Sequence, residues 1–147
     1  MARLAYKFRR VYPQDDNDDA RLLNALDKIC GLGGGLAFED GQRWWVALSP
    51  GGRLAVAYCG LAPSKQQLSA GYLCRAGVCP PHRGRGLQRA MIRLREKEAR
   101  ALGWARLVTD TTYNTVSANN LIACGYRLFD PKYPWAFRDT LYWTKEL

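Results

Sequence analysis

The chain has 147 residues and a mass of 16.6 kDa, which fits one domain with a two-layer core. Hydrophobic residues make up 48% of the sequence and charged residues 24%, so the chain can bury enough apolar surface to fold, which argues against disorder along its length. The 22 Lys and Arg against 13 Asp and Glu give a formal charge of +9, which favours anionic partners without choosing among them.

Membrane, secreted and metal-binding classes are also disfavoured. The longest apolar runs, such as residues 54–59, are far shorter than the ~18 residues that cross a bilayer, and no apolar signal region follows Met1. The five cysteines are an odd number without a C-x-x-C pair, and His82 is the only histidine. We therefore expect a reduced, cytoplasmic protein that has no metal site and does not contact a membrane.

The first elements are a strand, a helix and a strand meander. Residues 4–12 favour a strand, and the acidic run 15–19 supplies capping oxygens for an amphipathic helix that reaches Ile29. The glycine-rich run 31–35 predicts a flexible joint. Three antiparallel strands are then expected, at residues 43–49, 53–61 and 70–78.

The second half of the chain predicts a parallel crossover and a tail with two strands. An amphipathic helix from Leu87 to Gly103 and a strand at 105–110 follow, which makes a parallel strand–helix–strand unit. A short helix at 116–124 precedes two tail strands separated by a proline-rich turn. The fold class is therefore α/β, with a mixed, mostly antiparallel sheet of six or seven strands flanked by helices.

The chemically informative segment is VCPPHRGRGLQRAMIRL, residues 78–94, where a strand breaks at two prolines and an Arg/Gly-rich turn opens a helix. Unpaired backbone N–H groups at the start of a helix attract a pyrophosphate, and glycines allow its close approach. The Walker A pattern is absent, and G-x-G-x-x-G fails because residue 89 is Arg, so neither an NTPase nor a dehydrogenase is indicated.

The turn resembles the phosphate-binding motif of the GNAT superfamily of acetyl-CoA-dependent N-acetyltransferases, approximately V-x-P-x-x-R-G-x-G-[IL]-G. The residues in register are Val78, Pro80, Arg83, Gly84, Gly86 and Leu87. Gln88 stands where the family commonly has Gly or Ala. A second family signature, N-x-x-[AS] followed by G-[FY], is met by Asn114, Ser117, Gly125 and Tyr126.

This resemblance implies a single GNAT acetyltransferase domain over residues 1–147 and a parallel strand pair, 72–78 and 105–110, that splays apart to admit acetyl-CoA as co-substrate. Backbone groups of Ala76 and Val78 are then expected to bind the pantetheine. The expected pyrophosphate-binding residues are Arg83, Gly84, Arg85, Gly86, Leu87 and Gln88. Asn114 and Ser117 complete the expected cofactor-binding set.

The resemblance leaves the general acid open. Many family members place a Tyr four residues before the G-[FY] pair, where this chain has Leu121. Ser117, Tyr113 or Tyr126 are substitutes, although each also fits a packing or capping role. A thiol has a reference pKa of only ~8.5, so the thiolate needs little assistance to leave.

The candidate general bases are Asp110, Tyr72 and Glu39, or a chain of water molecules. Strand alternation puts Asp110 on the same face as Val108, where the family generally carries an aliphatic residue. Asp110 and Tyr72 are the catalytic candidates. The structural alternative is that Asp110 caps the strand end or pairs with an arginine.

The partners expected from the resemblance are an amine-bearing small molecule or peptide, with a monomer or a homodimer both open. The aromatic residues that could line an acceptor pocket are Trp44, Trp45, Tyr133, Trp135 and Phe137. Two alternatives stay open: a GNAT-like protein that binds acetyl-CoA without transferring it, and a basic nucleic-acid-binding module, which no motif favours.

Overall fold

The computed structural model describes residues 5–32 and 35–147, and these divide into two compact units. Unit 1 comprises residues 5–32, 35–60 and 75–87, and unit 2 comprises residues 61–74 and 88–147. Leu4 of the first expected strand, and Gly33 and Gly34 of the expected joint, lie outside the described residues.

Unit 1 contains a two-stranded antiparallel pair and a capped helix. Strand β1 (Lys7–Val11) pairs with β2 (Arg43–Leu48), and the register runs from Lys7 opposite Leu48 to Val11 opposite Trp44. Helix α1 (Asn17–Ile29) begins after Asp16, whose side chain accepts hydrogen bonds from the backbone amides of Asp18 and Asp19. The acidic run therefore caps the helix, as its composition predicted.

The two tryptophans of β2 belong to the core of unit 1. Trp44 and Trp45 are buried, and the Phe38 and Trp44 rings pack edge to face. Gly60 lies so close to the Trp44 ring that a Cβ there would be 2.8 Å from it. The expectation that Trp44 and Trp45 line an acceptor pocket is therefore wrong, because central strand positions bury both faces.

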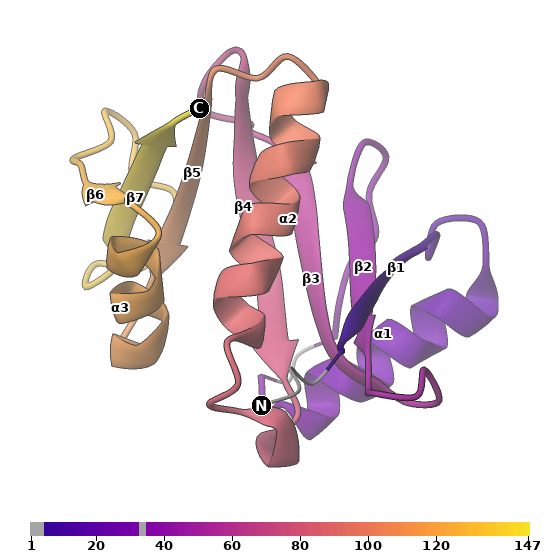
Figure 1. Cartoon of the computed structure of the whole chain (residues 1–147). Helices are drawn as coiled ribbons and strands as arrows, with labels where there is room; N and C mark the ends of the chain where they lie inside the picture. The colour runs from indigo at the N-terminus through magenta and orange to yellow at the C-terminus, as the bar shows by residue number, and fades with distance from the viewer. Residues whose placement is uncertain (1–4, 33–34) are drawn as a thin grey trace. The chain divides into compact units, whose positions relative to one another are not determined.

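Unit 2 holds most of the second half of the chain. Its elements are helix α2 (Leu87–Ala101, of which Leu87 belongs to unit 1), strand β5 (Arg106–Thr111), helix α3 (Thr115–Ala123), and strands β6 (Arg127–Leu128) and β7 (Leu141–Glu146). Antiparallel pairing joins β5 to β7 and β7 to β6 (Figure 1). Strands β3 (Ala55–Pro63) and β4 (Ala70–Val78) contribute residues to both units.

The described chain thus has three α-helices and seven strands in the order β1-β2-β3-β4-β5-β7-β6. The sheet is mixed and mostly antiparallel with one parallel pair, β4 and β5, so the predicted fold class is confirmed. The strand–helix–strand crossover through α2 accounts for the parallel pair.

The parallel pair separates after a short contact. Pairing joins Ala70, Gly71 and Tyr72 of β4 to Arg106, Leu107 and Val108 of β5, and then stops. In unit 2, beyond this point, the side-chain hydroxyl of Thr109 donates to the carbonyl of Leu73 (3.0 Å), and Arg95 donates to the carbonyl of Cys74 (3.3 Å). Beyond Tyr72 and Val108, side-chain hydrogen bonds replace the backbone pairing between β4 and β5, which confirms that the two strands splay apart as predicted.

Among the described residues, no helix has both the length and the apolar character that crossing a membrane requires.

Candidate functional site

The strand-to-helix turn in unit 1 is shaped by two prolines and two glycines. A single 3₁₀ turn, Pro80–His82, follows β4, and Gly84 and Gly86 then take left-handed backbone conformations with φ of +74° and +81°. A Cβ on either glycine would meet nothing within 4 Å. Glycine is required by the backbone angle, and the space around these positions is open to a ligand.

Arginine and tyrosine side chains hold this turn from within unit 1. Arg83 Nε donates to the carbonyl oxygen of Val78 (3.0 Å), and Arg85 Nη1 donates to the hydroxyl of Tyr6 (3.3 Å). The Tyr6 hydroxyl also lies 2.9 Å from Nδ1 of His82. Each arginine is exposed and uses one nitrogen in these bonds, so the remaining guanidinium N–H groups can meet an anion.

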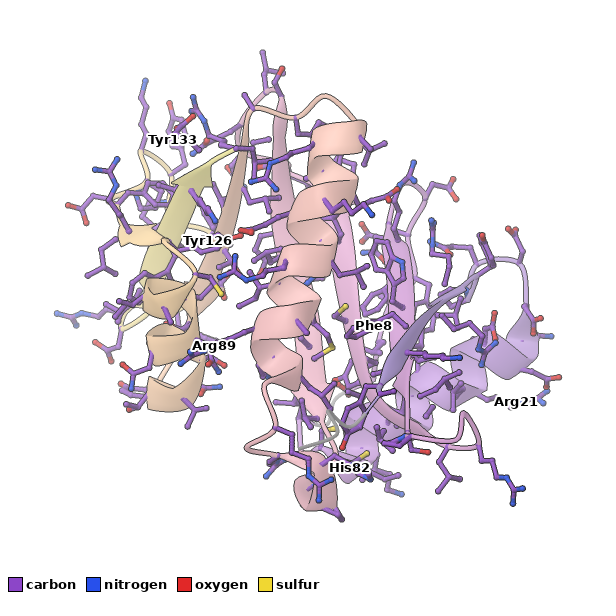
Figure 2. All side chains as sticks on the ribbon, viewed as in Figure 1. Phe8, Arg21, His82, Arg89, Tyr126 and Tyr133 are labelled. Atoms are coloured by element: carbon purple, nitrogen blue, oxygen red, sulfur yellow. The ribbon has the colours of Figure 1, made fainter. Side chains whose placement is uncertain are left out.

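Helix α2 opens directly after the turn. The side chain of Leu87 is buried, so only its backbone can contribute to a phosphate site, while Gln88 is half-buried. Arg89 extends toward α3, where its Nε donates to Oδ1 of Asn120 at 3.0 Å (Figure 2). The first amides of a helix have no carbonyl one turn earlier, so they remain available to an anion.

Asn114 and Ser117 come together at the start of α3 in unit 2. The Asn114 side chain is the N-cap and accepts a hydrogen bond from the backbone amide of Ser117 (3.0 Å). The second signature therefore has a local structural role in fixing the start of α3. Neither residue hydrogen-bonds Tyr72 or Asp110 within the described chain.

Asp110 and Tyr72, the two catalytic candidates, contact each other directly. The Tyr72 hydroxyl donates to Oδ2 of Asp110 at 2.6 Å, and the indole Nε1 of Trp135 donates to the same oxygen at 2.8 Å. All three residues are half-buried. Within the described chain Asp110 has no arginine partner, so the ion-pair alternative raised by the sequence is not what the structure contains.

Burial, followed by the negative charge and hydrogen bond of Asp110, raises the pKa of Tyr72 well above its ordinary value. Tyr72 is therefore protonated at neutral pH and acts as a hydrogen-bond donor to Asp110. This supports Tyr72 as a group that orients the carboxylate and disfavours it as a base.

Sequence reasoning missed the contact of Trp135 with Asp110. Trp135 lies in the segment between β6 and β7, and its ring packs edge-on against Tyr142 with ring centroids 4.6 Å apart. Proline and aromatic residues are concentrated in this segment, and this concentration is the signal in the sequence that could have pointed to a site. No local sequence pattern links residue 135 to residue 110, which lies 25 residues away. Tyr133 and Phe137 on the same segment are exposed.

The proposed substitutes for the missing tyrosine have other partners. Leu121 itself is buried. Tyr126 is buried and donates to Glu96 Oε2 (3.1 Å), which also binds Lys145 (2.9 Å); burial and the Glu96 charge raise the pKa of Tyr126. Tyr113 is exposed and donates to Asp139 (2.6 Å). Tyr126 thus belongs to a buried structural network.

Acidic, histidine and cysteine side chains form no group of three suited to a metal ion in residues 5–32 and 35–147. No disulfide bond joins any of the five cysteines in this described part of the chain.

Comparison with known proteins identifies the family. The sequence model of the acetyltransferase (GNAT) family matches residues 3–126, so the chain belongs to this family, as its two motifs predicted. Members of this family generally use acetyl-CoA as the co-substrate for acetyl transfer. No curated protein matches the chain in sequence.

Solved structures share the fold over nearly the whole chain. The ribosomal-protein-S18-alanine N-acetyltransferase of Escherichia coli is 13% identical, with a TM-score of 0.73 and coverage of 97% of this chain and 94% of that one. An acetyltransferase of Thermus thermophilus is 19% identical, with a TM-score of 0.71 and full coverage of both chains. The IAA acetyltransferase of Bacillus cereus is 16% identical, with a TM-score of 0.69 and coverage of 97% and 100%. Such low identities establish the fold alone.

Proposed function

We propose that the chain is an N-acetyltransferase that moves an acetyl group from acetyl-CoA to a primary amine on a small molecule or peptide. The amine attacks directly in a ternary complex, and residues 1–147 act as a single catalytic domain. The observation that carries the proposal is the strand-to-helix turn of residues 78–88, with its two left-handed glycines, in a chain of the GNAT family.

The turn fits the diphosphate of acetyl-CoA by its chemistry. The space beside Gly84 and Gly86 is open, and a side chain at either position would occupy the room that we propose for the diphosphate. Arg83 and Arg85 supply guanidinium groups next to these glycines in the sequence. The amides that start α2, including those of Leu87 and Gln88, supply further donors. The remaining expected ligands are the backbone groups of Ala76 and Val78 for pantetheine, with Asn114 and Ser117 at the start of α3.

Acetyl-CoA supplies an acetyl group activated as a thioester. The chain's own contribution to the chemistry is a carboxylate: an alkylammonium with a pKa of ~10 has to lose a proton before it can attack, and Asp110 accepts that proton directly or through water. Tyr72 holds Asp110 while it does so. Alignment of the two substrates contributes the rest of the acceleration.

A GNAT-like protein that binds acetyl-CoA without transferring it is the second candidate function, because buried Leu121 occupies the position of the usual tyrosine. A cytoplasmic location stays a prediction, as does the choice between monomer and homodimer.

The first experiment tests acetyl-CoA binding with a matched pair of glycine variants. Gly86 and Gly103 have similar left-handed φ values of +81° and +79° and equally open surroundings, but Gly103 lies beyond the other end of α2. Valine at either position costs a comparable backbone strain of roughly 1–2 kcal/mol. We expect acetyl-CoA to raise the melting temperature of the wild type and of Gly103→Val but not of Gly86→Val, with similar far-UV circular dichroism.

Calorimetry that detects no heat, together with no thermal shift at millimolar acetyl-CoA, would contradict the proposal. Normal binding by Gly86→Val would mean that the turn is not the diphosphate site. Transfer is then measured as thiol release with phenethylamine, spermidine and an alanine-initiated peptide, each with and without protein. Binding without thiol release from any of them would favour the second candidate.

A further inference from the structure

Asp110 receives two hydrogen bonds, and both reach the same oxygen. Tyr72 Oη and Trp135 Nε1 lie 2.6 Å and 2.8 Å from Oδ2. Within the described chain, Oδ1 accepts no hydrogen bond from a protein group. The two oxygens of this carboxylate are therefore in different environments.

The indole that makes the second bond is itself held in place. The Trp135 ring packs edge-on against Tyr142 and against Tyr72, with centroid distances of 4.6 Å and 6.3 Å, and Phe129 lies at 6.4 Å. The backbone amide of Ala136 donates to the Tyr142 hydroxyl at 3.0 Å. Because Tyr142 is buried and pairs with Asp110 across β5 and β7, the ring and the carboxylate are fixed to the same strand pair.

We propose that Trp135 is a positioning residue for acetyl transfer, which orients Asp110 so that Oδ1 faces the acceptor as the proton-accepting oxygen. The inference rests on the proposed function, and it assigns a role in the reaction to the segment between β6 and β7. A free carboxylate rotates with little preference about its last torsion. Rotation of Asp110 would break both bonds to Oδ2, so the Trp135 and Tyr72 donors together select one orientation.

The chain provides a matched control for this role. Trp143 is also a tryptophan that donates a hydrogen bond to β5, but its Nε1 reaches the hydroxyl of Thr111 at 2.9 Å instead of a carboxylate. Both donors contact neighbouring positions of the same strand. Trp135→Phe and Trp143→Phe each remove one indole N–H and leave an aromatic ring.

The kinetic experiment compares these two variants on the amine that the wild type acetylates fastest among phenethylamine, spermidine and the alanine-initiated peptide. We expect Trp135→Phe to lower kcat about tenfold, with KM for acetyl-CoA changed by less than about twofold, because positioning of a base acts on the chemical step. Trp143→Phe should change stability more than kcat, since Trp143 is buried.

A second readout separates positioning from simple loss of structure. Raising the assay pH toward the pKa of the acceptor ammonium delivers more amine already deprotonated, so the need for a base falls. Tyr72, the titratable partner of Asp110, keeps its proton in this range because its pKa is raised. The kcat deficit of Trp135→Phe should therefore shrink as pH rises, whereas a structural deficit would not.

Indole N–H resonances test the hydrogen bond without any acceptor. In ¹⁵N-labelled protein, Asp110→Asn should move the Trp135 indole signal and leave the Trp143 signal in place. An unmoved Trp135 signal, or a Trp135→Phe variant with kcat within twofold of the wild type, would overturn the proposal while leaving acetyl transfer intact. A wild type that binds acetyl-CoA but acetylates none of the three amines would instead favour the second candidate function, and the role of Trp135 in transfer would fall with the proposed activity.

Discussion

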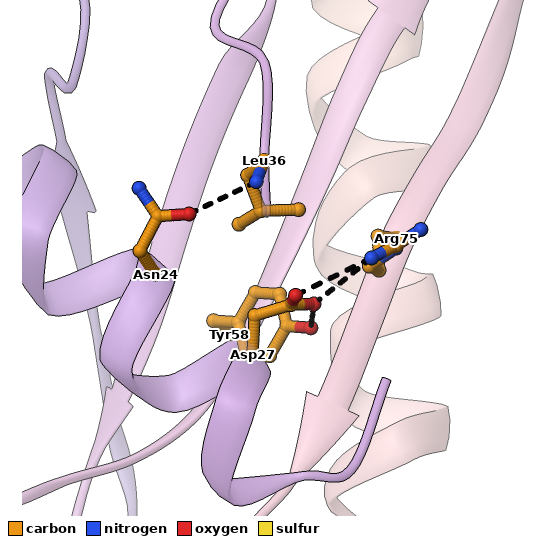
Figure 3. Close-up of polar contacts among 5 residues, drawn as sticks. All are labelled: Asn24, Asp27, Leu36, Tyr58 and Arg75. Atoms are coloured by element: carbon orange, nitrogen blue, oxygen red, sulfur yellow. Dashed lines mark hydrogen bonds and ion pairs between the residues drawn. The ribbon is translucent and has the colours of Figure 1, made fainter. Parts of the chain in front are cut away.

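Asp27 of unit 1 and Asp110 of unit 2 are each held by a tyrosine, but their second partners differ in charge. Asp27 is buried on α1, where it accepts a hydrogen bond from Tyr58 and forms an ion pair with Arg75 at 3.3 Å (Figure 3). The Arg75 guanidinium balances the carboxylate charge. The cluster therefore connects α1, β3 and β4 within unit 1 and leaves no unbalanced charge.

Asp110 has only neutral donors, Tyr72 and Trp135, and it is half-buried. Its negative charge has no cationic partner in the described chain, so an incoming ammonium can supply one. The two carboxylates thus differ in the charge of their second partner: the Arg75 guanidinium neutralises Asp27, which suits a role in stabilising the fold, whereas the neutral Trp135 indole leaves the Asp110 charge for the substrate ammonium that we propose.

Substitution of Asp27 should destabilise the protein more than any other change considered below. Asp27→Asn removes the charge that balances Arg75, and because the Arg75 side chain is 39% exposed we expect a loss of about 2–4 kcal/mol in the free energy of unfolding, below the full cost for a wholly buried pair. Asp18→Asn, in the exposed pair with Arg21 on the same helix, should cost less than about 0.5 kcal/mol. Urea unfolding measures both, and equal losses would contradict the structural role of Asp27.

The next effect concerns catalysis at Asp110. Asp110→Asn keeps an oxygen that can accept from Tyr72 and Trp135 but cannot take a proton, so kcat/KM should fall roughly 10²-fold with acetyl-CoA affinity nearly unchanged. Steady-state rates and calorimetry check the two parts. A loss below tenfold would mean that alignment carries the reaction and would remove Asp110 as the base.

Local signals predicted most of the fold. Asp16 and the acidic run marked the start of α1, and the two prolines and two glycines between β4 and α2 marked the turn, because caps and backbone angles depend on neighbouring residues. Strand β4 was predicted with the bounds that the structure has, Ala70–Val78. These features require no knowledge of tertiary contacts.

The site was only partly predictable. Strand alternation singled out Asp110, but its partners Tyr72 and Trp135 lie 38 and 25 residues away in sequence, and no periodicity relates them. The sequence places Trp44 and Trp45 among the residues that could line a pocket, because aromatic content alone does not distinguish a core from a cleft. Arg75 likewise gave no sign that it would pair with Asp27.

Alkaline pH should destabilise the protein through both clusters, because each contains a tyrosine with a raised pKa. Burial, together with Asp27 at Tyr58 and Asp110 at Tyr72, raises both tyrosine pKa values, so the folded state keeps protons that the unfolded state releases above about pH 10. The contribution of each neutral tyrosine to the free energy of unfolding is thus complete below about pH 10. Above about pH 10 the free energy of unfolding falls by up to about 1.4 kcal/mol per pH unit for each tyrosine. Urea midpoints measured across this range give the slope of the free energy of unfolding against pH. This slope should be shallower in Tyr58→Phe than in the wild type. An unchanged slope would argue against a neutral, buried Tyr58.

The same tyrosine-to-phenylalanine change can be made in both clusters, and we expect small effects from each. Tyr58→Phe and Tyr72→Phe each remove one hydroxyl that donates to a carboxylate. Loss of the completely buried Tyr58 hydroxyl should cost about 1–2 kcal/mol of stability and leave kcat unchanged, because Asp27 is buried and paired with Arg75. Tyr72→Phe should lose less stability but lower kcat about three- to tenfold, since Trp135 alone then orients Asp110. Unfolding curves and steady-state rates for the two variants decide this, and equal changes in kcat would mean that the two tyrosines do not differ in role.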